Sequence, residues 1–161
     1  MTMDIKEKVA LRQKEEALLC YPKFANEDAL TLGLKMVELA KEWGVAVAID
    51  IEVNGVQLFH YNMPGSNKRH CMWVRRKQNT VQVCQVSTLH AGQQLELLGK
   101  ELWRDWRLDE KDYAVIGGGF PITVAGTGII GAVACSGLPH EDDHRLIVTA
   151  ISQILGVDLN A

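Results

Sequence analysis

The spacing of apolar residues changes along the chain between a helical and a strand period, so both kinds of element are expected. Between residues 4 and 20, Ile5, Val9 and Leu19 recur at helical spacing among charged side chains. This pattern predicts an amphipathic helix that ends before Tyr21. The apolar side of such a helix must pack against another element, so we expect a folded core.

A second helix is predicted from Asn26 to about Trp43. Asn26 is a favoured N-cap residue, acidic residues follow it in the first turn, and Gly44 stands just beyond the predicted end. Helical spacing assigns the buried face of this helix to Ala29, Leu30, Leu34, Val37 and Ala40.

Two β-rich runs follow, VAVAIDI and VQLFHY, with Asn54 and Gly55 in the connection between them. Asn-Gly between such runs is the strongest short signal for a β-hairpin, because both residues tolerate the left-handed backbone of a tight turn. We therefore expect an antiparallel pair of strands here.

The remainder of the chain predicts two further helices, a second strand region and a closing helix. One helix covers residues 67 to about 78, although VQVCQV just after it alternates like a strand and leaves its end ambiguous; the next covers about Gly92 to Trp103. Residues 113 to 139 are rich in Val, Ile and Gly and predict two or three strands. The closing helix, from about His140 to Leu155, is expected to bury Leu146, Ile147, Ala150, Ile151 and Ile154.

This order of elements favours the α+β class, in which helices pack on a mainly antiparallel sheet, because the strands come in hairpins. No linker divides the 161 residues, so we expect one domain over residues 1–161. Hydrophobic residues make up 47% and charged residues 23%, as in ordinary soluble proteins. Without an apolar run of about 18 residues or a secretory signal, we expect a cytoplasmic protein with no membrane partner. Its scattered cysteines are expected to be free and mostly buried: Cys20, Cys71, Cys84 and Cys135.

The net charge of −3 conceals one basic segment. No Asp or Glu occurs between Glu52 and Glu96, and inside this gap lie Lys68, Arg69, Arg75, Arg76 and Lys77. A mostly acidic chain with one short basic run does not fit a nucleic-acid-binding surface, which normally makes the whole domain basic. The run does fit a local site for an anion.

Residues 140 to 144 read HEDDH and match the zinc-peptidase motif HExxH, in which two histidines hold zinc and the glutamate activates water. Here Pro139 places the motif in the first turn of a helix, where the helix dipole favours acidic residues without any metal. After His144 only Asp158 remains as an acid or histidine, although a third ligand from elsewhere in the chain stays open. We interpret the motif as an acidic helix start and expect no metal site.

The segment GGGFPITVAGTGIIGAVACSGLPHEDDHRLI resembles the C-terminal signature of the GlcG/HbpS-like family, also called the haem-degrading domain superfamily. The matching positions are Gly118, Gly119, Pro121, Ile122, Gly126, Ile130, Gly131, Ala132, Ser136, Gly137, Glu141 and Asp142. The rest of the chain, including NKRHCMWVRRKQNTV, resembles the uncharacterised branch of that superfamily. The resemblance implies a profilin-like fold with a five-stranded antiparallel sheet, and it implies homo-oligomers.

The same resemblance makes haem a candidate cofactor, because some members bind haem or a corrinoid-related tetrapyrrole and one type degrades haem. Two features of this chain depart from the haem-binding members. No histidine precedes His60, whereas one type of relative uses a histidine on its N-terminal helix. The basic run from Lys68 to Lys77 replaces a less charged helix.

The first candidate binding site is the loop of Ser136 and Gly137. It leads directly into the closing helix, where backbone N–H groups and the helix dipole favour an anion. Glu141 and Asp142 partly neutralise this end, and a structural role for the loop is the alternative.

The second candidate site is the basic helix itself, with residues Arg69, His70, Trp73, Arg75, Arg76 and Lys77. Helical spacing places Arg69 and Arg76 on one side, with Trp73 less closely, and Arg75 on another. Arginine clamps carboxylate or phosphate and tryptophan offers a flat apolar surface, so a small anion or a haem propionate would suit this pair. A solvated basic face is the alternative.

Haem iron also has candidate axial ligands in His60, His70, His90 and the four cysteines, although any of these side chains can simply be packed or hydrogen-bonded. No Ser-His-Asp, Cys-His or paired-carboxylate spacing stands out, so the catalytic residues are unknown.

Three functions stay open at this point. The first is a non-enzymatic, oligomeric protein that binds an anionic small molecule or a tetrapyrrole, with the anion held between the Ser136 loop and the basic helix, within one subunit or across a subunit boundary. The second is a haem-binding or peroxide-dependent haem-degrading protein. The third is a scaffold whose basic helix docks an acidic protein partner.

Overall fold

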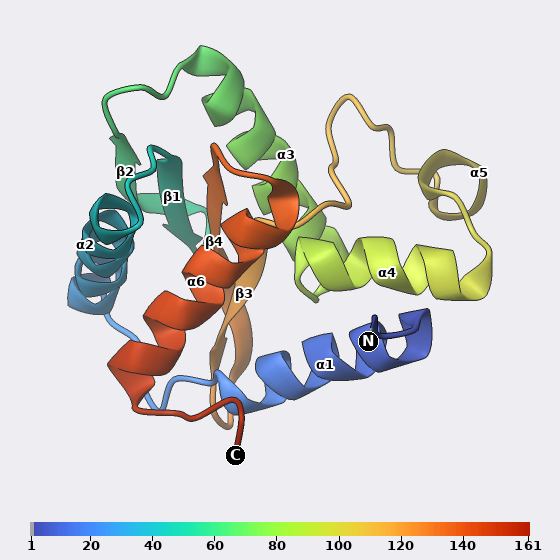
Figure 1. Cartoon of the computed structure of the whole chain (residues 1–161), viewed down its shortest axis with the longest axis horizontal. Helices are drawn as coiled ribbons and strands as arrows, with labels where there is room; N and C mark the ends of the chain where they lie inside the picture. The colour runs from blue at the N-terminus through green and yellow to red at the C-terminus, as the bar shows by residue number, and fades with distance from the viewer. Residues whose placement is uncertain (1) are drawn as a thin grey trace.

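A sheet of four antiparallel strands lies at the centre of the protein. In the computed structural model, which describes residues 2–161, the order of the strands is β2-β1-β4-β3. The hairpin of β1 (Ala48–Val53) and β2 (Val56–Asn62) joins the hairpin of β3 (Gly119–Val124) and β4 (Gly128–Ser136) through β1 and β4 (Figure 1). The predicted α+β class and mainly antiparallel sheet are thus confirmed.

The five-stranded sheet that the resemblance implied is wrong for this chain. The segment after α1 (Ile5–Leu18) does reach the free edge of β3, where Tyr21 N–H donates to Thr123 O at 2.8 Å. Ala125 N–H in turn donates to Tyr21 O at 2.9 Å, but this parallel bridge is one residue long. The chain bends at Pro22, so the pairing ends after one residue and the segment does not become a fifth strand.

The turn between β1 and β2 is the predicted Asn-Gly turn. Val53 and Val56 pair directly, and Asn54 and Gly55 between them have φ angles of 52° and 79°. These left-handed conformations belong to a two-residue hairpin turn, and Asn and Gly adopt them more readily than other residues.

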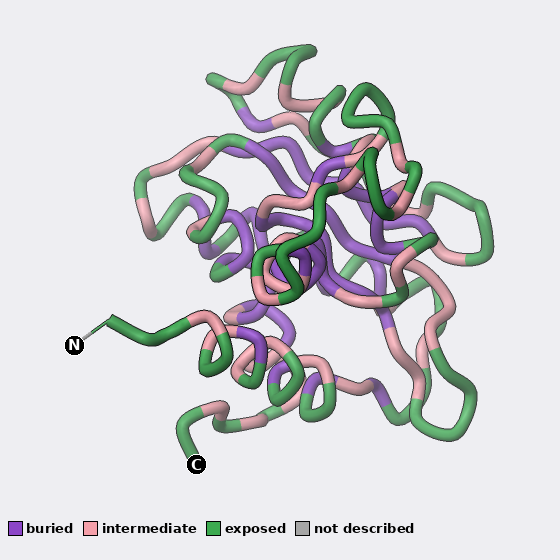
Figure 2. Tube along the Cα trace, turned by 90° about the vertical axis from the view of Figure 1, so that its right-hand side faces the viewer, coloured by how far each residue is buried: buried purple, intermediate pink, exposed green. Residues whose placement is uncertain are grey.

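Alternation along the strands divides the sheet into two different faces. Ile49 and Ile51 of β1 join the large apolar core, which α2 (Asn26–Glu42) and α6 (His140–Leu155) cover. The opposite face is crossed by α3 (Lys68–Cys84) and carries small residues such as Ala48 and Ala134. The burial pattern in Figure 2 follows this layering, with buried residues gathered along the strands and the inner sides of the helices.

Helix α3 comes very close to the sheet because the strand below it carries glycine. A Cβ added at Gly119 would lie 2.8 Å from Thr88 Cγ2 and 3.2 Å from Lys77 Cβ. No larger residue fits at this position without a shift of its neighbours.

The predicted buried face of α2 is partly wrong. Ala29, Val37 and Ala40 are buried as expected, but Leu30 and Leu34 are 46% and 55% exposed, whereas Leu32 and Met36 are fully buried. Asn26 is the first residue of the helix rather than its N-cap; the N–H of Ala25 donates to Asp28 at 2.7 Å.

The boundaries of the middle helices also differ from the prediction. Helix α3 continues into VQVCQV and ends at Cys84, because Val81 continues the helical spacing of its buried face. The helix expected from Gly92 to Trp103 is two helices, α4 (Thr88–Leu98) and α5 (Leu102–Trp106). Ser87 is the missed N-cap of α4, since its hydroxyl accepts from His90 N–H at 3.1 Å. Helix α6 confirms the closing helix, although Ile154 is only half-buried.

Helix α1 is attached to the rest of the protein largely by polar contacts, since Val9 and Glu15 are its only residues described as buried. Glu15 lies 2.6 Å from Nε2 of His144 in α6, and Glu16 lies 2.9 Å from Nδ1 of His90 in α4. Two neighbouring glutamates thus tie α1 to two different helices.

The four cysteines are free, but Cys135 alone among them is fully buried; Cys20, Cys71 and Cys84 are half-buried. No helix within residues 2–161 is both long and apolar enough to cross a membrane.

The unequal burial of neighbouring leucines in α2 gives a direct test of this packing. We expect Leu32→Ala to lower the free energy of unfolding by about 2–5 kcal/mol, because it leaves a cavity in the core. The matched change Leu34→Ala should alter it by no more than about 0.5 kcal/mol, since that side chain is exposed. Urea denaturation of the two variants measures both values, and equal losses would contradict the orientation of α2.

Candidate functional site

The structure brings six of the eight predicted ligand-binding residues around one cavity of about 380 Å³. The cavity lies between the first half of α3 and the corner that connects β4 to α6, and we call it the corner cavity. The six residues are Arg69, His70, Trp73, Lys77, Ser136 and Gly137. The basic helix and the Ser-Gly loop are therefore neighbours in space.

Arg75 and Arg76 lie outside the corner cavity. Arg75 pairs with Glu52 of β1 at 3.2 Å, and it lines a different cavity of about 500 Å³ on the strand side of α3. The guanidinium of Arg76 stacks over Trp73 at 4.0 Å and donates to Tyr113 O at 3.3 Å. Helical spacing correctly placed Arg75 and Arg69 on different sides of α3, but it could not show that the Arg76 side chain turns away from the corner cavity.

Lys77 is not a free cation, because it forms a buried ion pair with Asp143. The Lys77 ammonium lies 3.2 Å from Asp143 Oδ2 and donates to Cys135 O at 2.8 Å, and both charged side chains are at most 2% exposed. Burial raises the pKa of Asp143 to about 6, against the opposing effect of Lys77. The pair joins the middle of α3 to the first turn of α6.

The same carboxylate satisfies the backbone of the Ser-Gly corner. Leu138 N–H donates to Asp143 Oδ1 at 3.1 Å. Asp143 therefore occupies the place near the helix N-terminus where an external anion is expected from the sequence, and it neutralises this end in addition to the predicted Glu141 and Asp142. An anion in the corner cavity must instead be bound by side chains at its rim.

Three such side chains offer hydrogen-bond donors. Arg69 is exposed, and none of the ion pairs formed within residues 2–161 includes it. His70 Nδ1 accepts from Asn67 N–H at 2.9 Å, and His140 Nδ1 accepts from Gly117 N–H at 3.0 Å. A neutral imidazole that accepts at Nδ1 carries its proton on Nε2, so both rings present an Nε2–H donor. His70 and His140 both line the corner cavity.

The histidines of the HExxH match have separate roles in the structure. His140 accepts the Gly117 hydrogen bond, whereas His144 is buried 2.6 Å from Glu15. The part of the chain that the structure describes contains no group of three or more side chains able to hold a metal ion.

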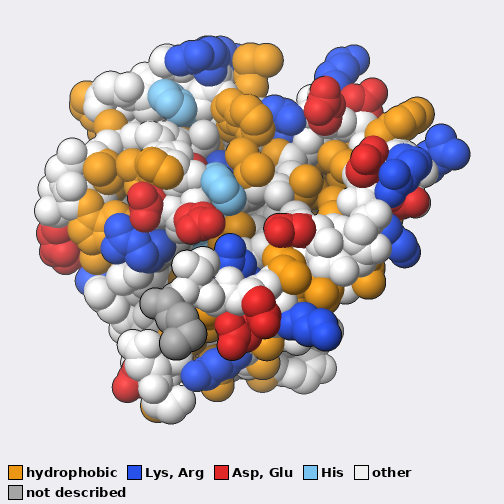
Figure 3. Space-filling model, turned by 45° about the vertical axis from the view of Figure 1, so that its right-hand side comes forward, with side chains coloured by type: hydrophobic (Ala, Val, Ile, Leu, Met, Phe, Trp, Pro, Cys, Tyr) orange, Lys and Arg blue, Asp and Glu red, His pale blue; other side chains and the backbone are white. Residues whose placement is uncertain are grey.

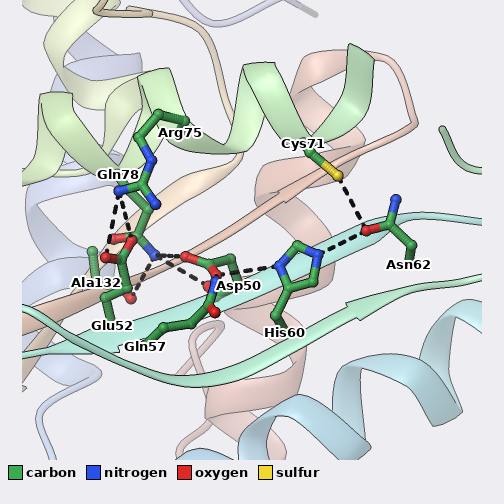
Figure 4. Close-up of polar contacts among 9 residues, drawn as sticks. All are labelled: Asp50, Glu52, Gln57, His60, Asn62, Cys71, Arg75, Gln78 and Ala132. Atoms are coloured by element: carbon green, nitrogen blue, oxygen red, sulfur yellow. Dashed lines mark hydrogen bonds and ion pairs between the residues drawn. The ribbon is translucent and has the colours of Figure 1, made fainter. Parts of the chain in front are cut away.

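A buried polar network on the strand side of α3 was missed by the sequence reasoning. Asp50 and Glu52 of β1 both face α3 and are 2% and 7% exposed. Gln78 donates to Asp50 Oδ2 at 3.1 Å, and His60 Nδ1 lies 3.3 Å from Asp50 Oδ1 (Figure 4). Burial, followed by the neighbouring Asp50, raises the pKa of Glu52, and Arg75 opposes this change. The available signal was an acid near the end of the predicted strand, Asp50, and a second acid two residues later, Glu52, in the connection that follows.

This network accounts for two of the predicted axial ligands of haem iron. His60 has contacts at both ring nitrogens, since its Nε2 lies 2.8 Å from Asn62 Oδ1. The thiol of Cys71 donates to the same Asn62 oxygen at 3.1 Å (Figure 4). Neither side chain is thus left without a partner for an iron to replace.

The surface on the side of α3, α4 and α5 carries basic groups interspersed with acidic and apolar ones (Figure 3). This face is not a continuous basic field of the kind that nucleic acid requires.

These features define an α+β protein with a central four-stranded sheet and cavities of ligand size beside its central helix. Residues 24–152 match the family model described as haem degrading protein HbpS-like, so the chain belongs to the HbpS-like family.

Comparison with individual proteins agrees with this assignment. A UPF0303 protein of Streptomyces coelicolor is 42% identical, over 92% of this chain and 94% of its own length. The crystal structure of the Ybr137w protein shares 25% identity with a TM-score of 0.85, and the match covers 97% of this chain and 90% of that one. A complex of PduOC with haem has 24% identity and a TM-score of 0.69, covering 80% and 93%, and shows likeness of fold.

The buried Asp143 gives a testable pH dependence. Its pKa rises from 3.8 in the unfolded chain to about 6 in the folded protein, so the folded state binds this proton more tightly. The contribution of the protonated Asp143 carboxyl to the free energy of unfolding is fully present below about pH 4 and is lost as the pH rises through about 6. Relative to Asp143→Asn, the wild type should lose about 3 kcal/mol across this window.

Urea denaturation at several pH values measures this difference. Asp142→Asn is the matched control, because Asp142 is the neighbouring acid and is only partly buried. If the free energy of unfolding of the wild type and of Asp143→Asn changed with pH in parallel, the buried carboxyl would not be the cause of the pH dependence.

Proposed function

We propose that this protein binds a small organic anion, such as a carboxylate, in the corner cavity. The observation that supports this most is the convergence of Arg69, His70 and His140 on one cavity, each with a donor that is not used by a carboxylate of the described chain. The volume of about 380 Å³ lies within the range of small-molecule sites.

Different side chains of the corner cavity would contact the charged and the apolar part of the ligand. The Arg69 guanidinium can take both oxygens of a carboxylate in a bidentate contact. The Nε2–H groups of His70 and His140 supply further donors, and Trp73, which is 37% exposed, offers an aromatic surface to the body of the ligand. The proposed ligand is therefore an anion with an apolar or aromatic part.

Haem binding is the second candidate. It is favoured by the description of the family and by the likeness of fold to PduOC, whose solved structure is a complex with haem. In the corner cavity, however, an iron would meet His70 or His140 at a nitrogen that carries the proton, because each Nδ1 already accepts a backbone hydrogen bond. We therefore place carboxylate binding before iron coordination at this site, and a Soret shift on haem addition that depends on His70 would reverse this order.

The wider expectations remain part of the proposal. They are a cytoplasmic location, a homo-oligomer, and neither nucleic acid nor membrane as a partner. Exposed apolar side chains outside α2, such as Val56 of β2 and Met72 of α3, support an oligomer, because large apolar side chains on a surface are often covered by a second copy. A scaffold function has no comparable support from the geometry.

Replacement of Arg69 tests the proposed site. A panel of aliphatic and aromatic carboxylates is screened for a rise in melting temperature, and the strongest binder is then titrated by calorimetry. Arg69→Gln should weaken binding about ten- to a hundredfold, because a charged hydrogen bond is lost.

Arg75→Gln is the matched control, since it removes the same charge from the other side of α3 and should leave the affinity unchanged. A panel that never raises the melting temperature would refute the proposal, as would an equal loss of affinity in both variants.

A further inference from the structure

A second cavity of different character lies where α1, the end of α3, α4 and α5 meet. Its volume is about 550 Å³, and we call it the helix cavity. The apolar part of the lining includes Val83, Val86, Trp106 and Leu108, and the polar part is His90 with two glutamine side chains. No Lys, Arg, Asp or Glu of residues 2–161 lines it, so it does not suit a charged ligand.

His90 is held in one orientation by Glu16 of α1. Its Nδ1 lies 2.9 Å and 3.1 Å from the two carboxylate oxygens, and the ring is 6% exposed. Glu16 is fixed in turn by Ser87 N–H, which donates to it at 2.7 Å. The neutral ring therefore carries its proton on Nδ1, and Nε2 is left with a lone pair.

The hydrogen bonds of the His90 ring within the described chain involve Nδ1 and leave Nε2 unpaired but open to solvent. His70 and His140 have the opposite arrangement, with Nδ1 as the acceptor and Nε2 as the donor. His144 also pairs with a glutamate of α1, but its ring packs against Phe120 with the centroids 5.9 Å apart. Among these histidines, His90 thus combines a free acceptor nitrogen with a place on a cavity wall.

The other polar groups of the cavity agree with a neutral occupant. Burial raises the pKa of the Cys84 thiol, so this side chain adds no negative charge. Gln13 and Gln94 contribute uncharged amides. A ligand that displaces water from Nε2 must supply one good donor, because an acceptor that becomes buried without a partner is costly.

We propose that the helix cavity binds a neutral hydroxyaromatic compound of the phenol class. The O–H group of the compound donates to Nε2 of His90, and its ring packs among Val83, Val86, Trp106 and Leu108. An organic anion finds no cation here, and a hydrocarbon leaves Nε2 unpaired. The site is separate from the corner cavity and does not depend on anion binding there.

The test compares two probes that differ by one hydroxyl group. Calorimetry at mildly alkaline pH measures the affinity of the wild type for 4-fluorophenol and for fluorobenzene. We expect the phenol to bind about ten times more tightly or better, because it makes one buried hydrogen bond that fluorobenzene cannot make. His90→Phe keeps an aromatic ring but removes the acceptor, and it should abolish this preference. His70→Phe, in the corner cavity, should preserve it.

Because His90 also helps to hold α1, a measurement on the unaltered protein accompanies the variants. A long-range 1H–15N spectrum of the imidazoles should show Nε2 of His90 as unprotonated, and 4-fluorophenol should shift that resonance while fluorobenzene leaves it in place. Equal affinities for the two probes, or a protonated Nε2 in the free protein, would overturn the proposal. So would a haem Soret shift that requires His90 in a protein that does not bind 4-fluorophenol.

Discussion

The buried ion pair between Lys77 and Asp143 determines how the functional parts of this protein are arranged. It joins the middle of α3 to the first turn of α6, at a point where the Cys135 carbonyl of β4 also binds the ammonium. Loss of one member of such a pair leaves an uncompensated buried charge, which typically costs about 3–5 kcal/mol. The pair therefore fixes the position of Arg69 and His70, two turns earlier on α3, relative to the Ser-Gly corner.

The two ends of α3 produce two cavities with opposite chemical character. Its first half carries exposed donors beside the corner, where the acid that could neutralise them is already paired with Lys77. Its last turn, with Val83 and Cys84, meets α1 and α4 in a neutral environment whose free polar atom is an acceptor. The corner cavity is thus suited to an anion and the helix cavity to a neutral hydrogen-bond donor. Two carboxylates create this difference, because Asp143 of α6 pairs with Lys77 and Glu16 of α1 pairs with His90.

Local signals in the sequence predicted the parts of the fold that depend on neighbouring residues. The Asn54-Gly55 turn and the start of α6 after Pro139 are of this kind. Contacts between distant residues decided the rest. The rotation of α2 depends on which leucines meet the core, and the missing fifth strand follows from the bend of the chain at Pro22 beside the edge of β3.

In the candidate site, too, some features were predictable from the sequence and others depended on contacts between distant residues. The proximity of the arginine-rich helix to the Ser-Gly corner was part of the hypothesis drawn from the sequence, but the pairing of Lys77 with Asp143 and the turn of Arg76 towards Tyr113 were not. Asp50 and Glu52 were visible as two acids at and just beyond the end of a predicted strand, yet their burial depends on a helix that crosses above them. The tautomers of the histidines required backbone positions that no sequence pattern contains.

The most direct test of this account is a crystal structure of the protein with the carboxylate that raises its melting temperature most. We expect the carboxylate to lie in the corner cavity, within hydrogen-bonding distance of the Arg69 guanidinium and of an Nε2–H from His70 or His140. A ligand bound instead beside Asp50, Arg75 and Arg76, on the strand side of α3, would contradict it.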